Sequence, residues 1–235
     1  RDLANAMGGE YDLAEPETML EKALTAMSPG TSYLEALAEA GELITEEKWE
    51  EARTSLETLI EGAGYIPGEE NAHGLLAYVY QQLEDTEKER ETWIKIAEND
   101  AHDLDAVTRL LTMAFERDDW IDLKKWSNAW LAINPLAETP WRALLRTGEE
   151  LGESDHAIKA GEALVALDPH DIASVHYRLA KQYMPSNKTR AHRQVIMALE
   201  EAPRYRDAYK LLHQINNPSD EDAFLTGFKV PPVHE

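Results

Sequence analysis

Eight histidines and a large excess of carboxylates are the side chains of this chain most able to do chemistry. The 235 residues include 45 acidic and 23 basic residues, which gives a formal net charge of −22. No histidine belongs to a His-Glu-x-x-His motif or to a spacing typical of zinc sites. His170 and His176 are six residues apart, with an expected helix start between them. We therefore interpret the histidines as polar residues of loops and helix surfaces, not as metal ligands.

Other motifs of catalysis are also missing from the sequence. Without cysteine the chain has no disulfide framework, no thiolate zinc site and no cysteine nucleophile. It contains no Gly-x-Gly-x-x-Gly, no phosphate loop and no Gly-x-Ser-x-Gly elbow. Asp103 and Asp105 lie near His102, and we interpret the two aspartates as helix N-terminal capping residues. The sequence thus predicts no catalytic residue, no cofactor and no metal, in a protein that is not an enzyme.

The charge is unevenly distributed along the chain. Residues 1–103 contain 25 acidic and 7 basic residues, whereas residues 104–235 contain 20 acidic and 16 basic residues. An acidic excess repels nucleic acid phosphates and anionic lipid head groups, so we expect neither as a partner. No apolar run approaches the roughly 18 residues of a membrane span, so we expect no membrane insertion. The lack of a visible leader slightly favours the cytoplasm, and export stays open because both compartments tolerate cysteine-free proteins.

Prolines recur along the chain at a fixed interval. Pro135, Pro169 and Pro203 are 34 residues apart, and one more step of 34 leads back to Ala101 in another polar break. Each interval divides into two amphipathic segments of about 13 residues with a short turn between them. Small residues recur where two helices must approach closely: Ala77, Ala157, Ala163, Ala180, Ala191 and Ala198. The period predicts antiparallel helix pairs stacked one after another.

This pattern resembles the tetratricopeptide repeat (TPR) family. The clearest copy has the tryptophan, leucine, mid-repeat glycine, second-helix alanine and closing Asp-Pro of the motif, at Trp141, Leu144, Gly148, Ala157, Asp168 and Pro169. The sequence departs from the motif at Glu89 and Leu123, where the family prefers a small alanine. The resemblance covers about residues 33–216. It implies an all-α fold, a TPR-like right-handed superhelical solenoid of antiparallel helix pairs with about five repeats plus terminal helices.

The repeat register predicts the organisation of the chain. We expect residues 1–15 to be a linker or the remnant of a preceding region, and residues 16–216 to form one TPR-like helical repeat domain. Its units are expected at about 33–67, 70–103, 104–137, 138–171 and 172–205, with a capping helix at 205–215. A further amphipathic helix is predicted from Pro16 to Met27, ended by Ser28-Pro29-Gly30. Residues 217–235 are expected to be an extended C-terminal tail.

The resemblance also places candidate binding residues. In TPR proteins the first helix of each unit lines the concave surface, and residues three or four apart share one side of a helix. On those faces lie the candidate residues of a peptide- or partner-binding groove: Tyr78, Arg109, Thr112, Arg142, Arg146, Tyr177, Arg178, Lys181 and Lys210. Arginine can hold a carboxylate with two parallel hydrogen bonds, so the groove suits a peptide with acidic groups. In a competing interpretation, the arginines pair within the chain with Glu149, Glu150 or Asp171.

The function expected from this arrangement is non-catalytic protein–protein interaction, with a peptide or partner protein held in the concave groove. An alternative is that the chain is the C-terminal helical-repeat region of a larger enzyme, a hydrolase or protease, in which it positions substrate or supports the catalytic domain. The start at Arg1 without methionine favours that longer parent chain. A third hypothesis is a purely structural self-assembly module. Fold analogy alone does not separate the three.

The C-terminal tail suggests self-association. Residues 219–228 combine an acidic cluster with Phe224 and Phe228. Such a segment could dock into the basic groove of its own chain or of a neighbour, which would occlude the groove or lead to a homo-oligomer. The competing interpretation is a disordered tail whose Phe224, Leu225 and Phe228 pack against the last helix.

Overall fold

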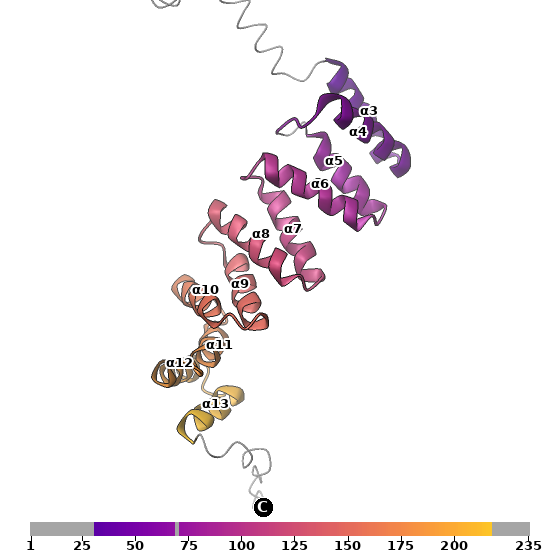
Figure 1. The fold of residues 1–235 in the computed structure, drawn as a ribbon. Helices are drawn as coiled ribbons and strands as arrows, with labels where there is room; N and C mark the ends of the chain where they lie inside the picture. The colour runs from indigo at the N-terminus through magenta and orange to yellow at the C-terminus, as the bar shows by residue number, and fades with distance from the viewer. Residues whose placement is uncertain (1–30, 69–70, 218–235) are drawn as a thin grey trace, which may run out of the picture. The chain divides into compact units, whose positions relative to one another are not determined.

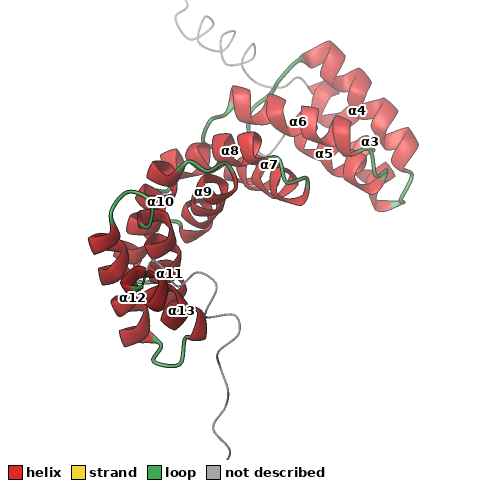
Figure 2. Cartoon of the chain, turned by 60° about the horizontal axis from the view of Figure 1, so that its bottom comes forward, coloured by secondary structure: helices red, strands yellow, loops and turns green. Residues whose placement is uncertain are grey.

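The computed structural model describes residues 31–68 and 71–217. The predicted linker at 1–15, the predicted helix at 16–27 and the tail from residue 218 onward lie outside the described residues. Within those ranges the chain forms helices joined by short connections, and no strand is present (Figure 2). This confirms the all-α fold class predicted from the sequence.

The helices follow one another as antiparallel pairs. They are α3 (Thr31–Thr45), α4 (Trp49–Ala63), α5 (Ala72–Gln82), α6 (Thr86–Asn99), α7 (Leu104–Glu116), α8 (Trp120–Ile133), α9 (Glu138–Glu150), α10 (Ser154–Leu167), α11 (Ile172–Tyr183), α12 (Lys188–Glu201) and α13 (Arg206–Asn216). The two helices of each pair, from α3–α4 to α11–α12, pack against each other, and α13 follows alone (Figure 1). We call the first helix of each pair, together with α13, an inner helix and the second an outer helix.

The helices form two compact units, divided between Ala101 and His102. Unit 1 contains α3 to α6, and unit 2 contains α7 to α13. The predicted single domain over residues 16–216 stays a prediction.

Short polar side chains begin several of the helices. The side chains of Asn71, Asp85, Asp103, Asp119 and Asn187 each accept a hydrogen bond from a backbone N–H of the first turn. Such a bond satisfies a donor that the helix itself leaves unpaired. For Asp103 the acceptor is Oδ1, 2.8 Å from the nitrogen of Ala106, which confirms the capping role predicted for this residue.

The turns inside the α5–α6, α7–α8 and α9–α10 hairpins each have one residue in the left-handed region. Glu84, Asp118 and Gly152 have φ values of 57°, 51° and 68°, and they are 34 residues apart in sequence. Only glycine adopts this conformation without a steric penalty. The glycine at position 152 is therefore explained by the backbone geometry of this turn.

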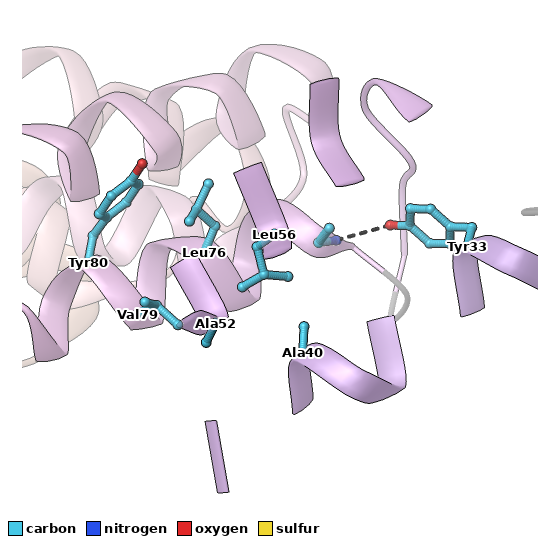
Figure 3. Close-up of a cluster of buried hydrophobic side chains, with 8 residues drawn as sticks. Tyr33, Ala40, Ala52, Leu56, Leu76, Val79 and Tyr80 are labelled. Atoms are coloured by element: carbon cyan, nitrogen blue, oxygen red, sulfur yellow. Dashed lines mark hydrogen bonds between the residues drawn. The ribbon is translucent and has the colours of Figure 1, made fainter. Parts of the chain in front are cut away.

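One core cluster of unit 1 is built from three successive helices. Ala40 of α3, Ala52 and Leu56 of α4, and Val79 of α5 are fully buried and lie toward one another (Figure 3). Alanines at these crossings let the helices approach, and the larger side chains fill the remaining space. Tyr33 closes one end of the cluster, where its hydroxyl accepts a hydrogen bond of 3.3 Å from the backbone N–H of Ala72.

The core of unit 2 repeats the same construction. Its α9 to α12 segment contains the buried cluster Leu145, Ala157, Ala160, Leu164, Val175, Leu179, Tyr183 and Ala191. Leu123, at a position where the TPR motif prefers alanine, is fully buried in α8, and Glu89 is buried at the corresponding place in α6. The departures from the motif therefore fall on interior positions of the fold.

The interpretation of all histidines as surface residues was wrong for two of them. His73 of α5 and His176 of α11 are 5% and 2% exposed. His176 Nδ1 lies 2.6 Å from Oε1 of Gln194. His73 packs against the ring of Tyr65, with 5.2 Å between centroids, and its Nδ1 has no hydrogen-bond partner. Each imidazole lies on the helix face that the amphipathic pattern directs toward the core. The polarity of histidine therefore gave the wrong expectation about its exposure.

We expect His73 to make unit 1 sensitive to acid. Burial, with a smaller contribution from Lys95, lowers the pKa of His73 below its ordinary value of 6.5. The unfolded chain therefore takes up a proton on this residue before the folded chain does, and stability should fall as the pH drops below about 6.5. Between pH 7 and pH 5, the urea concentration at the midpoint of unfolding of unit 1 should fall less in His73→Phe than in the unsubstituted chain. The same substitution at exposed His170 is the control, and equal losses in both variants would contradict the prediction.

Candidate functional site

The predicted basic residues lie on successive inner helices of unit 2. Side-chain contacts connect each of these helices to the next. Arg146 of α9 contacts Phe115 of α7, Arg178 of α11 binds Glu149 of α9, and the ring of Tyr177 in α11 packs on that of Tyr205, just before α13. We call the exposed side chains of α7, α9, α11 and α13 the inner face of unit 2.

Arg142 is occupied by carboxylates of its own unit. Its two terminal nitrogens donate to the two oxygens of Asp171, at 2.9 and 2.5 Å, and Nη2 also lies 3.0 Å from Glu138. The guanidinium of Arg142 holds the pKa of Asp171 below its ordinary value, mainly through these hydrogen bonds. The paired carboxylate in turn raises the pKa of Arg142. This bidentate pair ties α9 to the loop that begins α11.

Arg178 makes a second pair of the same kind. Its Nε and Nη2 donate to Glu149, at 3.0 and 2.7 Å, and both side chains are about three-quarters buried. Arg142 with Asp171 and Glu149 with Arg178 are each 29 residues apart, and both pairs cross from one inner-helix segment to the next. Breaking such a partly buried pair would leave a desolvated charge. Both pairs therefore hold neighbouring hairpins in register.

Arg146 has a different environment from the other two arginines. Its guanidinium lies over the rings of Phe115 and Trp120, 4.8 and 5.2 Å from their centroids. Its contact with the Asp118 carboxylate is long, at 3.9 Å, and its side chain is 41% exposed. The aromatic rings attract the cation while leaving its hydrogen-bond donors accessible.

The other predicted cations differ in their exposure and in whether they are paired. Lys181 is exposed one turn after Arg178 on α11, and its ammonium group has no partner among the described residues. Lys210 is exposed but lies 2.8 Å from Asp207. Arg109 is half-buried and has a contact of its own, and the Thr112 hydroxyl donates to the carbonyl of Thr108. Arg146 and Lys181 are therefore the candidate cations whose charge is least neutralised by carboxylates of the described residues.

Two of the predicted residues are aromatic. Tyr177 is half-buried against Tyr205, with 5.0 Å between centroids, and burial raises the pKa of its hydroxyl. Tyr78 belongs to unit 1, where its exposed ring meets Trp49 edge-on at 6.0 Å. Tyr78 is not part of the inner face of unit 2.

The aromatic support of Arg146 was not predicted from the sequence. Phe115 is 44% exposed at the end of α7, although a phenylalanine near a helix end would ordinarily be buried. Its position, one turn beyond Thr112 on the same helix face, was the available signal. The helical spacing of Trp120 indicates packing alone and gives no sign of its contact with this guanidinium.

The structure also bears on metal binding and on membrane insertion. Within residues 31–68 and 71–217, no three histidine or carboxylate side chains are grouped so that they could hold a metal ion. None of the helices described above is both long and apolar enough to cross a membrane.

Comparison with known proteins supports the fold. No protein-family model matches the sequence, and no curated protein matches it. Among solved structures, the chain is similar to YrrB, described as a TPR protein with an unusual peptide-binding site, with 16% identity over 74% of this chain and 89% of that one and a TM-score of 0.50. A MamA structure matches with 15% identity over 86% and 100% of the two chains and a TM-score of 0.48. The thermophilic TPR protein TTC0263 of Thermus thermophilus matches with 18% identity over 78% and 98%, and a TM-score of 0.39. The likeness to YrrB confirms the predicted TPR-like fold.

Proposed function

We propose that this chain, whose fold is that of the tetratricopeptide repeat, is a non-catalytic protein-interaction module. In this proposal the inner face of unit 2 binds an extended or helical segment of a partner protein that bears acidic groups. The peptide-binding site named for YrrB is a precedent on the same fold. Helical repeats suit this role because each hairpin is held by its neighbours, so the exposed faces of the inner helices stay available for a partner.

The observation that carries the proposal is the contrast among the basic residues. Arg142 and Arg178 are neutralised by bidentate carboxylates, whereas Arg146 rests on two aromatic rings and Lys181 has no partner among the described residues. Arg146 and Lys181 are thus the groups that would receive an acidic side chain or a C-terminal carboxylate. Arg142 and Arg178 would act as positioning residues, since they fix α9 against α11.

The remaining predicted residues have smaller roles in this proposal. Arg109 and Thr112 of α7 and Lys210 of α13 lie on the inner helices that flank α9 and α11, and Tyr177 lies on α11 itself. These residues would contact the partner beyond its acidic groups. An exposed phenylalanine beside the Arg146 guanidinium provides an apolar contact next to a cation. The preferred segment would therefore carry an acidic residue close to an apolar one.

The proposal predicts which charges matter for binding. We would measure, by fluorescence anisotropy, the affinity of a panel of labelled peptides of equal length that differ in acidic content and in a free or amidated C-terminus. Replacing Arg146 and Lys181 by alanine should weaken binding of the acidic peptides about a hundredfold, at about tenfold for each lost charge contact. The loss should shrink as salt is added, because exposed charges are screened.

The matched control removes two cations from outer helices of the same unit. Lys159 of α10 and Lys188 of α12 are both exposed, and their replacement by alanine gives the same change in net charge. Affinity should stay within about twofold, since these charges lie away from the inner face. An equal loss in both double variants would mean that only net charge attracts the peptides, and the proposed site would be wrong. Binding of neutral peptides with the same affinity would also contradict it.

A further inference from the structure

A large groove lies along the first hairpin of unit 1. Its volume is about 930 Å³, and Tyr33 and Ala36 of α3 form one wall. The other wall is a stripe of α4 that recurs every three or four residues: Glu50, Glu51, Thr54, Ser55, Thr58, Leu59, Gly62 and Ala63. Such a stripe is one continuous side of the helix.

The groove is apolar although threonines line it. The Thr54 hydroxyl donates to the carbonyl of Glu50, and that of Thr58 donates to the carbonyl of Thr54, at 2.9 and 2.8 Å. These bonds satisfy the hydroxyls within the helix, which leaves methyl groups to form the wall. At Gly62 a Cβ atom would meet no atom within 4 Å. The only charged side chains of the lining, Glu50 and Glu51, stand at one end of the stripe.

Two smaller grooves show what the corresponding side of an outer helix faces in other repeats of this chain. In unit 1, Lys88, Glu91, Thr92 and Lys95 of α6 line a groove of about 360 Å³ whose opposite wall is Glu57, Ile60 and Glu61 of the preceding outer helix, α4. In unit 2, Arg190, Arg193, Gln194 and Met197 of α12 line one of about 280 Å³, opposite Glu162 and Val165 of α10. In both cases the third, sixth, seventh and tenth residues of an outer helix face the outer helix before it.

The same four positions of α4 are Glu51, Thr54, Ser55 and Thr58, and all four line the large groove. The α4 wall of the groove thus uses the positions that contact the preceding outer helix in the other two repeats. No preceding outer helix is present among the described residues. Where α6 carries Glu91 and Lys95, α4 carries Thr54 and Thr58, so its wall suits a closely packed apolar helix. We propose that residues 16–27 of this chain occupy the groove as the outer helix of an additional half-repeat.

The sequence before α3 has the features that this occupant needs. The segment from Pro16 to Met27 repeats apolar residues with helical spacing: Met19, Leu20, Ala23, Leu24 and Met27. Three residues separate it from α3, and four residues join α8 to α9 and α10 to α11. So short a connection spans at most about 14 Å, which keeps the segment beside the first hairpin. The first inner helix would then be covered on the side that the array leaves open.

Amide hydrogen exchange on the whole, unsubstituted chain tests this occupant. Amides of residues 19–27 should exchange about a hundredfold more slowly than in an unstructured peptide. Thr58→Arg places a charge in the middle of the groove wall and should return these amides to unprotected rates while α5 stays protected. Thr45→Arg, the same substitution in α3 outside the groove lining, should leave the protection intact. Unprotected amides in the unsubstituted chain, or protection that survives Thr58→Arg, would overturn the proposal.

Cross-linking identifies which molecule fills the groove. Because the natural chain has no cysteine, pairs can be introduced on a clean background. Thr58→Cys with Leu24→Cys, on the apolar face of the segment, should form an intramolecular cross-link about tenfold faster than Thr58→Cys with Thr25→Cys, on its polar face. Equal rates for the two pairs, or cross-links found only in dimers, would overturn the proposal. The second result would show that another copy of the chain fills the groove.

Discussion

Truncation of Leu164 to alanine is expected to destabilise unit 2 by about 3 kcal/mol. Leu164 of α10 is fully buried in the cluster that α9, α10 and α11 build with Leu145, Val175 and Leu179. Alanine would remove apolar area from the core and leave a cavity, because helices held on both sides by neighbouring hairpins can close the space only in part. Urea unfolding followed by circular dichroism would measure the loss.

The matched control is Leu136→Ala, in the loop between α8 and α9. This leucine is 74% exposed, so its truncation should change the free energy of unfolding by less than about 0.5 kcal/mol. In a repeat array each hairpin is stabilised by its neighbours, so amide exchange in Leu164→Ala should rise most in α9 to α12 and least in unit 1. Similar losses for the two leucines would contradict the assignment of this core.

The helix pairs were predictable because two independent features of the sequence show their period. The spacing of Pro135, Pro169 and Pro203 marks the ends of hairpins, and the small residues mark the crossings. Ala157, Ala180 and Ala198 are all fully buried, as the pattern requires. These features depend on local spacing, which a single sequence shows directly.

The pairing of charges on the inner face was less predictable. The sequence placed Arg142, Arg146 and Arg178 on inner helices but left open whether they face a partner or bind Glu149 and Asp171. That choice depends on which side chains of successive inner helices come within reach, over 29 residues of chain. The structure shows both bidentate pairs, while the binding role of the remaining candidates stays a prediction.

Buried histidines and the support of Arg146 were missed for a related reason. Phenylalanine is among the residue types most often buried, whereas histidine is intermediate. His73 is nevertheless buried and Phe115 exposed, because tertiary packing and not residue type sets their exposure. The position of each on its helix was a better guide than its chemistry.

Gly148 carries the second large expected effect. It lies near the end of α9, where a Cβ atom would stand 2.7 Å from the backbone nitrogen of Ala157 and 2.8 Å from its Cβ. Alanine favours a helix over glycine by about 1 kcal/mol, but here α9 and α10 would have to separate. Because the obstructing atoms include backbone, we expect Gly148→Ala to destabilise unit 2 by about 2 kcal/mol net.

The same substitution at Gly41 should have the opposite sign. Gly41 lies inside α3, where an added Cβ meets no atom within 4 Å, so Gly41→Ala should stabilise unit 1 by about 0.5–1 kcal/mol. Comparing the two variants by urea unfolding separates helix propensity, which favours both, from the close approach of α9 and α10, which only one of them disturbs. Stabilisation by both substitutions would mean that α9 and α10 are less closely packed than described. The glycine of the repeat motif would then act through the backbone of its own helix, and not through the contact between helices.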